Sequence, residues 1–186
     1  STVEILEFGV PQGSILGPLL FLRYINDLPK ATEFFIKLYA YDTFLCYQHE
    51  NIKDLVKNVN AELEKVFYWL SANRLTLNVS KSKFMIITKK RIDYSNIVIN
   101  IHGEALDQCD SYKYLGVYFD KSLSWKTHVD YICQKISKFC GSLVKIRNCV
   151  ELETCREIYH AIIHSYLQYG IFAWGSAPKT TLKPLQ

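Results

Sequence analysis

The most regular pattern in the chain lies between residues 52 and 70, where apolar residues recur every three or four positions. This spacing places them on one face of a helix, while the lysine and glutamate residues between them fall on the opposite face. The pattern therefore predicts an amphipathic helix that packs on a core. Its apolar positions are Ile52, Leu55, Val56, Val59, Leu63, Val66, Phe67 and Leu70.

Three further segments show helical patterns. Two of them, at about 127–147 and 152–169, lie near the carboxyl end. The third follows Ser14, which we expect to cap its first turn, and ends before Pro29. This third segment is apolar nearly all round, so we expect the helix to be buried.

Short runs of aromatic and β-branched residues predict strands at 34–39 and 43–47. Only three residues separate these two runs, which predicts a tight hairpin. Further strands are predicted at 83–88, 96–101 and 112–119. Sheet gives way to helices near Asp120–Trp125, so the sequence indicates an α+β chain with a boundary at that point.

Composition limits the possible classes of protein. Hydrophobic residues make up 49% and charged residues 22%, as in an ordinary globular protein. No apolar run reaches the roughly 18 residues that span a bilayer, so we expect no membrane partner. The six cysteines have irregular spacing and there is no signal peptide, which indicates an intracellular protein with reduced thiols.

Charge is unevenly distributed along the chain. The formal net charge is +4, but residues 1–50 carry −3 and the remaining residues carry +7. A basic second part suits a polyanionic partner such as a nucleic acid.

Several short motifs follow one another in a fixed order, beginning with the stretch Gly9–Phe21, which reads G-V-P-Q-G-S-I-L-G-P-L-L-F. The others are the turn Tyr39-Ala40-Tyr41-Asp42-Thr43, Trp69 with Asn73-x-Leu75, the segment Leu77–Met85, Lys113–Val117 with Asp120, Leu123-x-Trp125-x-x-His128, and Tyr169-Gly-Ile-x-x-Trp174-Gly175. In this order and spacing they resemble the reverse transcriptases of LINE-like (non-LTR) retrotransposons, especially the jockey-type elements. The resemblance extends over nearly the whole chain.

The resemblance implies a fold and an activity. Residues 1–122 would form the later half of a right-hand polymerase palm, an antiparallel sheet with packed helices, and residues 123–186 a helical thumb. The parent activity would be RNA-directed DNA synthesis with an RNA template, a DNA primer, deoxynucleoside triphosphates and magnesium. The parent element would work in the cytoplasm and the nucleus, and this chain would be a fragment of its polymerase.

The resemblance also assigns roles to individual residues. The incoming nucleotide and the template would lie against Pro11, Gln12, Gly13, Ser14, Tyr39 and Ala40. Lys81 would stabilise the triphosphate charge, and the primer would be gripped by Tyr114, Leu115 and Gly116. Without the resemblance, a plain helix-entry turn, a solvated lysine and a buried strand would be the favoured interpretations of residues 12–14, Lys81 and residues 114–116.

The catalytic position departs from the family pattern. In the family, the hairpin tip carries two adjacent aspartates that hold magnesium, because hard divalent ions prefer carboxylate oxygens. Asp42 corresponds to the second aspartate, whereas Tyr41 replaces the first, and the strand that carries another family carboxylate is not in the sequence. A phenol is neutral at neutral pH and is a poor magnesium ligand. We therefore expect a catalytically inactive chain.

Two other interpretations stay open. The chain would be a nucleic-acid-binding module without catalysis if its basic part alone is functional, or a working polymerase if a longer chain supplies the missing parts. His160 and His164 have the spacing of a zinc-binding pair, but Ala161 stands where the metalloprotease motif has glutamate. We interpret them as ordinary helix residues.

Overall fold

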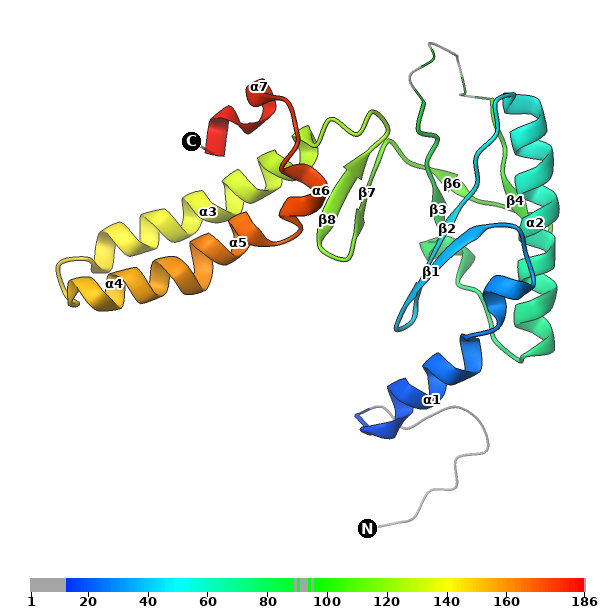
Figure 1. The fold of residues 1–186 in the computed structure, drawn as a ribbon, viewed down its shortest axis with the longest axis horizontal. Coiled ribbons are helices and arrows are strands. Elements are labelled where there is room, and N and C mark those ends of the chain that lie inside the picture. The colour runs from blue at the N-terminus through cyan, green and yellow to red at the C-terminus, as the bar shows by residue number, and fades with distance from the viewer. Residues whose placement is uncertain (1–12, 89, 91–93, 95, 186) are drawn as a thin grey trace. The chain divides into compact units, whose positions relative to one another are not determined.

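The structure is a computed structural model that describes residues 13–185 except 89, 91–93 and 95. Helices alternate with small antiparallel sheets, which confirms the predicted mixture of helix and strand (Figure 1). The chain divides into two compact units. The first unit comprises residues 1–83 and 93–107, and the second comprises 84–92 and 108–186.

The amino-terminal half of the structure is built around one long helix and one hairpin. The hairpin pairs β1 with β2 in antiparallel register, and a second, very short hairpin pairs β4 with β5. The elements up to residue 108 are α1 (Leu16–Ile25), a 3-10 turn (Leu28–Lys30), β1 (Phe35–Tyr39), β2 (Asp42–Cys46), α2 (Ile52–Ala72), a second 3-10 turn (Val79–Lys81), β3 (Lys83–Phe84), β4 (Asn100–Ile101), β5 (Glu104–Ala105) and β6 (Asp107–Gln108).

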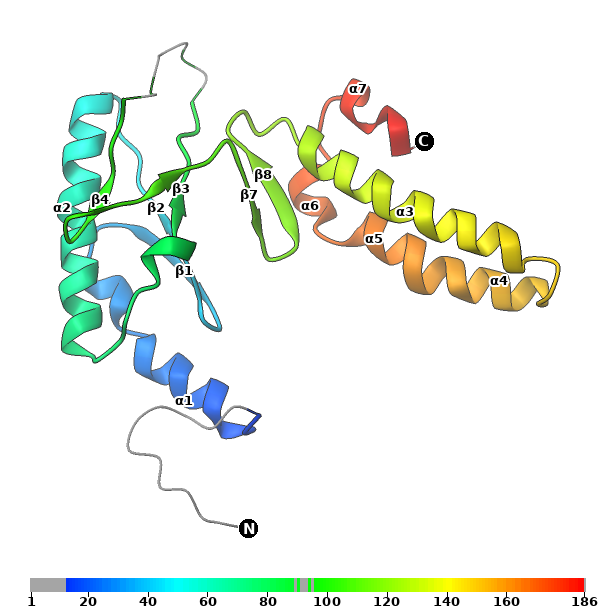
Figure 2. The same ribbon diagram turned by 180° about the vertical axis from the view of Figure 1, so that it is seen from behind.

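The second unit is a hairpin followed by helices. Helix α3 lies alongside the helical run from α4 to α5, as both views show (Figures 1 and 2). The elements are β7 (Ser111–Tyr114), β8 (Val117–Asp120), α3 (Lys126–Ile146), α4 (Leu152–Ile158), a π-helix (Tyr159–His164), α5 (Ser165–Gln168), α6 (Ile171–Trp174), α7 (Lys179–Leu182) and a final 3-10 turn (Lys183–Leu185).

Helix α2 packs on the core of the first unit through one face, as its amphipathic pattern predicted. Asn51 caps it, since its side-chain oxygen accepts a hydrogen bond from the backbone N–H of Lys53 at 2.8 Å. The helix lies against β4 of the same unit. The buried apolar residues of this unit are Ile25, Leu28, Phe34, Leu63, Val66, Leu70, Ile99 and Ile101.

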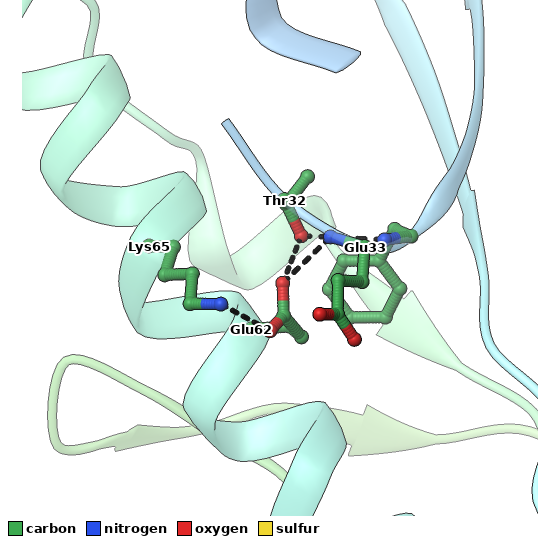
Figure 3. Close-up of polar contacts among 5 residues, drawn as sticks. Thr32, Glu33, Glu62 and Lys65 are labelled. Atoms are coloured by element: carbon green, nitrogen blue, oxygen red, sulfur yellow. Dashed lines mark hydrogen bonds and ion pairs between the residues drawn. The ribbon is translucent and has the colours of Figure 1, made fainter. Parts of the chain in front are cut away.

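A buried carboxylate joins α2 to the start of the β1–β2 hairpin. Glu62 is 5% exposed and accepts hydrogen bonds from the Thr32 hydroxyl at 2.6 Å and the Glu33 backbone N–H at 2.7 Å (Figure 3). Lys65 donates to its other oxygen at 2.5 Å. Burial raises the pKa of Glu62, but these hydrogen bonds outweigh burial and lower it to about 2. Glu62 therefore remains charged and holds the chain that enters β1.

Helix α1 differs from the prediction in its environment. The helix forms at the expected place with Ile15, and not Ser14, at its N-cap position, and the Ser14 hydroxyl one residue earlier accepts a hydrogen bond from the Gly17 N–H at 2.9 Å. However, only Gly17 and Ile25 are buried, and Leu16, Leu19 and Leu20 are each more than half exposed. The prediction of a buried helix is wrong for this structure. An apolar helix surface favours burial, but the composition of the helix does not show which other segment packs against it.

The segment 112–119, predicted as one strand, is a hairpin. Strands β7 and β8 pair in register from Ser111↔Asp120 to Tyr114↔Val117, and the turn between them consists of Leu115 and Gly116. Both turn residues have positive φ, 45° and 84°, which suits the right-handed twist of a two-residue hairpin. The sequence interpretation missed the turn because Leu115 is a poor turn residue and the run on either side is continuously β-prone.

The core of the second unit lies where α3 meets the hairpin and the later helices. Its buried apolar residues are Val117, Val129, Ile132, Ile163, Trp174 and Ala177, together with buried Asp120 and His128. The β7–β8 hairpin belongs to this unit. The palm–thumb boundary predicted between residues 122 and 123 is a separate, functional division and stays a prediction.

Candidate functional site

The turn between β1 and β2 carries the residues expected at a catalytic centre. Tyr39 pairs with Asp42 across the hairpin, so the turn consists of Ala40 and Tyr41 alone. Ala40 has a φ of 47°, in the left-handed region that an alanine rarely adopts. The structure thus brings these four predicted residues together at one hairpin tip.

Tyr41 is 67% exposed, yet its ring lies against another aromatic ring. The centroids of the Tyr41 and Phe21 rings are 4.6 Å apart at an interplanar angle of 48°, within the range of favourable aromatic pairs. Phe21 belongs to α1, and the first part of this helix is also the end of the stretch Gly9–Phe21. The contact therefore joins two of the sequence motifs. The sequence reasoning did not foresee it, although Phe21 is the last residue of its motif.

The donor set at the tip does not fit a magnesium pair. Asp42 is exposed at the start of β2 and the neighbouring position holds a phenol. Within the part of the chain that the structure describes, no group of three or more histidine, cysteine, aspartate or glutamate side chains is arranged to hold a metal ion. A two-metal centre needs several converging carboxylates. The described residues offer no such set.

The other residues expected near the nucleotide are only partly described. Pro11 and Gln12 lie outside the described residues. Gly13 has a φ of 85°, and a Cβ added there would meet no atom within 4 Å, so the glycine serves the backbone conformation. Lys81 ends the 3-10 turn after α2, is exposed, and donates its backbone N–H to the Asn78 side chain at 3.1 Å.

The expected primer-gripping residues Tyr114, Leu115 and Gly116 form the end of the β7–β8 hairpin, in the second unit. The Tyr169 hydroxyl donates a hydrogen bond to the Leu115 carbonyl at 2.6 Å. A Cβ on Gly116 would lie 3.0 Å from the Tyr169 ring, so only glycine fits there without displacement. Two motifs that the sequence analysis treated separately are therefore in contact.

Beside this hairpin lies a group of lysines and tyrosines that the sequence analysis did not single out. The Lys113 ammonium donates to the Tyr131 hydroxyl at 3.1 Å and lies 4.5 Å from the centre of the Tyr131 ring. That hydrogen bond raises the pKa of Lys113. Lys135 lies 5.7 Å from the centre of the same ring. The tyrosine–lysine spacing of 131 and 135, one helical turn apart, was a signal available in the sequence.

His128 and the histidine pair of the last helices show no catalytic arrangement. His128 is 2% exposed; its Nδ1 accepts a hydrogen bond from the Tyr118 N–H at 3.3 Å, while its Nε2 has no hydrogen-bond partner among the described residues. Burial, with a smaller effect of nearby Lys113, lowers the pKa of His128, so the ring is neutral at neutral pH. His160 and His164 lie in the π-helix with ring centres 5.3 Å apart.

Comparison with known proteins identifies the family. The profile of the family described as "Reverse transcriptase (RNA-dependent DNA polymerase)" matches residues 4–119. This match covers more than half of the chain, which therefore belongs to the reverse transcriptase family. No known three-dimensional structure matches the chain.

Within that family, the chain is similar to polymerases of non-LTR retrotransposons. It is 29% identical to the RNA-directed DNA polymerase from mobile element jockey of Drosophila funebris, over the whole chain and 21% of the relative. It is 27% identical to the probable RNA-directed DNA polymerase from transposon BS of Drosophila melanogaster, over the whole chain and 22% of the relative. The expected family is confirmed. The chain spans about a fifth of the length of these relatives.

The described residues also bear on the expectation about membranes. Among them, no helix combines the length and the apolar character needed to cross a bilayer.

Proposed function

We propose that this chain is a segment of a retrotransposon reverse transcriptase that contributes to binding the RNA template and the DNA primer but does not add nucleotides. Residues 1–122 act as the later part of the palm and residues 123–186 as the thumb. The observation that carries the proposal is Tyr41 at the hairpin tip, in the place of a family aspartate.

The position of Tyr41 supports loss of catalysis in two ways. A neutral phenol supplies no negative oxygen to a divalent cation. Its ring also packs 4.6 Å from the Phe21 ring, so the side chain has a favourable apolar contact to hold it there. Metal stabilisation of the transition state contributes several kcal/mol, so its loss slows nucleotide addition by about a thousandfold or more.

The remaining assignments follow from the same proposal. Gln12, Gly13 and Ser14 line the nucleotide and template with Tyr39 and Ala40, and Lys81 lies near the triphosphate. The turn Leu115–Gly116, with Tyr114 before it, contacts the primer. Magnesium takes no part in a step by this chain, because Asp42 lacks its carboxylate neighbour.

A reciprocal primer-extension experiment tests the proposal. In an active jockey polymerase, the first aspartate of the corresponding turn is replaced by tyrosine; the expected result is a loss of extension of about a thousandfold. The control replaces the residue that corresponds to exposed Thr43 by serine and keeps activity. The purified chain itself is assayed in parallel. Extension by the chain with Tyr41 in place, or by the tyrosine variant of the jockey enzyme, would overturn the proposal.

A second function, a nucleic-acid-binding module without any link to polymerisation, is favoured by one observation, the lysine–tyrosine group of the second unit. Binding of an RNA–DNA hybrid by the purified chain with no extension is common to both functions. An experiment in the jockey enzyme distinguishes the two functions. Replacing the residues that correspond to Lys113, Tyr131 and Lys135 should lower primer extension only if these residues serve polymerisation.

A further inference from the structure

A line of lysines runs from the β7–β8 hairpin along one face of α3. On α3, Tyr131, Lys135, Lys138, Ser142 and Lys145 are separated by alternating intervals of four and three residues, which places them on one stripe of the helix. Lys113 reaches Tyr131 at one end of this stripe from β7. We call the four residues Lys113, Lys135, Lys138 and Lys145 the lysine track.

The stripe lies beside the buried face of α3 and not on it. The buried residues His128, Val129 and Ile132 face the core of the unit, whereas Lys138 and Lys145 are exposed and Lys135 is half-buried. No member of the track forms an ion pair among the described residues of the chain. The only acidic residue within α3 is Asp130, which lies outside the stripe. Among the described residues, no ion pair neutralises the positive charge of the track.

At one end of the track, aromatic contacts hold the lysine side chains in place. Both Lys113 and Lys135 lie over the ring of Tyr131, at 4.5 and 5.7 Å from its centre. The Tyr118 ring supports the same tyrosine, with centroids 5.1 Å apart, and lies 5.5 Å from the Lys113 ammonium. Cation–π attraction to the Tyr131 ring thus holds the Lys113 and Lys135 ammonium groups close together despite their mutual repulsion, and the hydrogen bond to the Tyr131 hydroxyl adds to this for Lys113.

We propose that the lysine track is a binding site for the phosphodiester backbone of one nucleic-acid strand, with Tyr131 as the residue that positions Lys113. The length of the track fits this ligand. Lys135 and Lys145 are ten residues apart, which corresponds to about 15 Å along a helix. One strand of a duplex presents about one phosphate every 3.4 Å, so the track faces four or five phosphates.

The chemistry of the track also determines what it does not recognise. The Tyr131 ring is occupied by lysines and Tyr118, so no base stacks on it, and lysines that contact phosphates carry no information about the base sequence. Binding by the track is therefore independent of nucleotide sequence and sensitive to salt. For the identity of its ligand this inference rests on the proposed function.

The first test measures binding of the whole chain to a fluorescent RNA–DNA hybrid at several salt concentrations. A site variant replaces Lys113, Lys135 and Lys138 by alanine, and a control variant replaces Lys30, Lys53 and Lys57, three exposed lysines of the first unit. Both variants lose the same charge. The slope of log Kd against log salt is expected to become shallower by about 2 to 3 for the site variant only. An equal change of this slope in both variants, or an unchanged slope in the site variant, would overturn the proposal that the track binds the nucleic acid.

The variant Tyr131→Phe tests whether the Tyr131 hydroxyl positions Lys113, independently of the number of lysine charges. The variant keeps every ammonium and the aromatic ring but loses the hydroxyl that holds Lys113, so the hybrid should bind about three- to tenfold more weakly with an unchanged salt slope. A reduced slope, or an unchanged affinity, would contradict the positioning role. Replacing the three site lysines by arginine should retain the slope of the unchanged chain.

A second measurement uses the unchanged chain and so does not depend on the folding of any variant. Lysine acetylation is followed residue by residue with and without the hybrid, and protection is expected at Lys113, Lys135 and Lys138 but not at Lys30, Lys53 or Lys57. Protection by polyglutamate but not by the hybrid would contradict the inference. Absence of protection at the track lysines would contradict the track as a binding site but would not affect the primer-extension result. The two proposals can therefore be tested independently.

Discussion

Tyr169 donates its hydroxyl hydrogen to the backbone carbonyl of Leu115, at 2.6 Å, and so links the end of α5 to the turn of the β7–β8 hairpin. The Trp174 indole N–H donates to the Tyr169 carbonyl at 2.9 Å, and Trp174 is only 3% exposed. A buried tryptophan thereby fixes the tyrosine that holds the turn. We infer that the carboxyl-terminal motif stabilises the conformation of the hairpin.

This link predicts a small but local effect of Tyr169→Phe. The variant loses one hydrogen bond while the ring keeps its contact with Gly116, so the free energy of unfolding should fall by about 0.5–1.5 kcal/mol. Hydrogen exchange should become faster at residues 114–117 and remain unchanged near the β4–β5 turn. The matched control is Tyr159→Phe, whose hydroxyl has no hydrogen-bond partner among the described residues. Equal effects of the two variants would contradict the link.

Two turn glycines with nearly the same φ allow steric contact to be separated from backbone strain. Gly103 and Gly116 have φ values of 81° and 84°, but an added Cβ meets nothing within 4 Å at Gly103 and lies 3.0 Å from the Tyr169 ring at Gly116. Gly103→Ala should cost about 1–2 kcal/mol, the cost of a left-handed alanine. Gly116→Ala should cost more.

The measurement for this pair is urea unfolding, followed by hydrogen exchange in each hairpin. Because the chain has two compact units, a single transition cannot be assumed, and exchange reports on each hairpin separately. Combining Gly116→Ala with Tyr169→Leu should remove most of the additional cost, because the smaller side chain makes room for the methyl group. A Gly116→Ala effect no larger than that of Gly103→Ala would show that the contact is unimportant.

Glu62 predicts how stability depends on acid. Its folded pKa of about 2 lies below its ordinary value of 4.5, so the charged form stabilises the folded state. This contribution is fully present above pH 4.5 and is lost as the pH falls toward about 2. A shift of this size corresponds to roughly 3 kcal/mol for a single group, taken as an upper value.

Unfolding measured between neutral pH and strong acid tests this dependence against Glu62→Gln. The glutamine variant should be less stable at neutral pH, because Lys65 loses its ionic partner, and it should lose less stability on acidification. Asp120 contributes in the same direction, since hydrogen bonds from Ser122, Ser124 and Trp125 overcome burial and lower its pKa. Part of the acid dependence should therefore persist in Glu62→Gln. If the unchanged chain and Glu62→Gln lost the same stability on acidification, Glu62 would not contribute to the acid dependence.

Asp120 also predicts the behaviour of the start of α3. Its two carboxylate oxygens accept hydrogen bonds from the backbone and hydroxyl groups of Ser122 and Ser124, and from the Trp125 N–H at 2.8 Å. Trp125, just before the helix, has a φ of 64°, a conformation that costs energy unless it is held in place. Asp120→Asn, which accepts through one oxygen only, should cost about 1–3 kcal/mol. Faster hydrogen exchange at residues 126–129 would report the loosened helix start, whereas unchanged exchange there would contradict this role.

Local pattern predicted some elements well and others poorly, since the strands predicted at 83–88 and 96–101 form only over Lys83–Phe84 and Asn100–Ile101. The hairpin 35–46 and the helix 52–72 were predictable because short β-prone runs and a long 3.6-residue period are local signals. The contact between Phe21 and Tyr41 was not predictable, since the two residues meet only in the folded chain. The Lys113–Tyr131 contact was missed for the same reason.

The exposed face of α1 leads to a last prediction, on self-association. Ile15, Leu16, Leu19 and Leu20 are 94%, 63%, 63% and 54% exposed, and the nearby hairpin adds Phe35 and Tyr39 at 58% and 61%. Apolar patches of this kind drive association, and in the described part of the chain β1 and β2 pair only with each other, which leaves the outer edges of the hairpin without a strand partner there. The purified chain should therefore form oligomers at micromolar concentration in light scattering. Leu16→Lys combined with Leu19→Lys should shift it toward the monomer, whereas Lys53→Leu with Lys57→Leu should not. A sharply monomeric unchanged chain that melts cooperatively would show that this surface does not cause association.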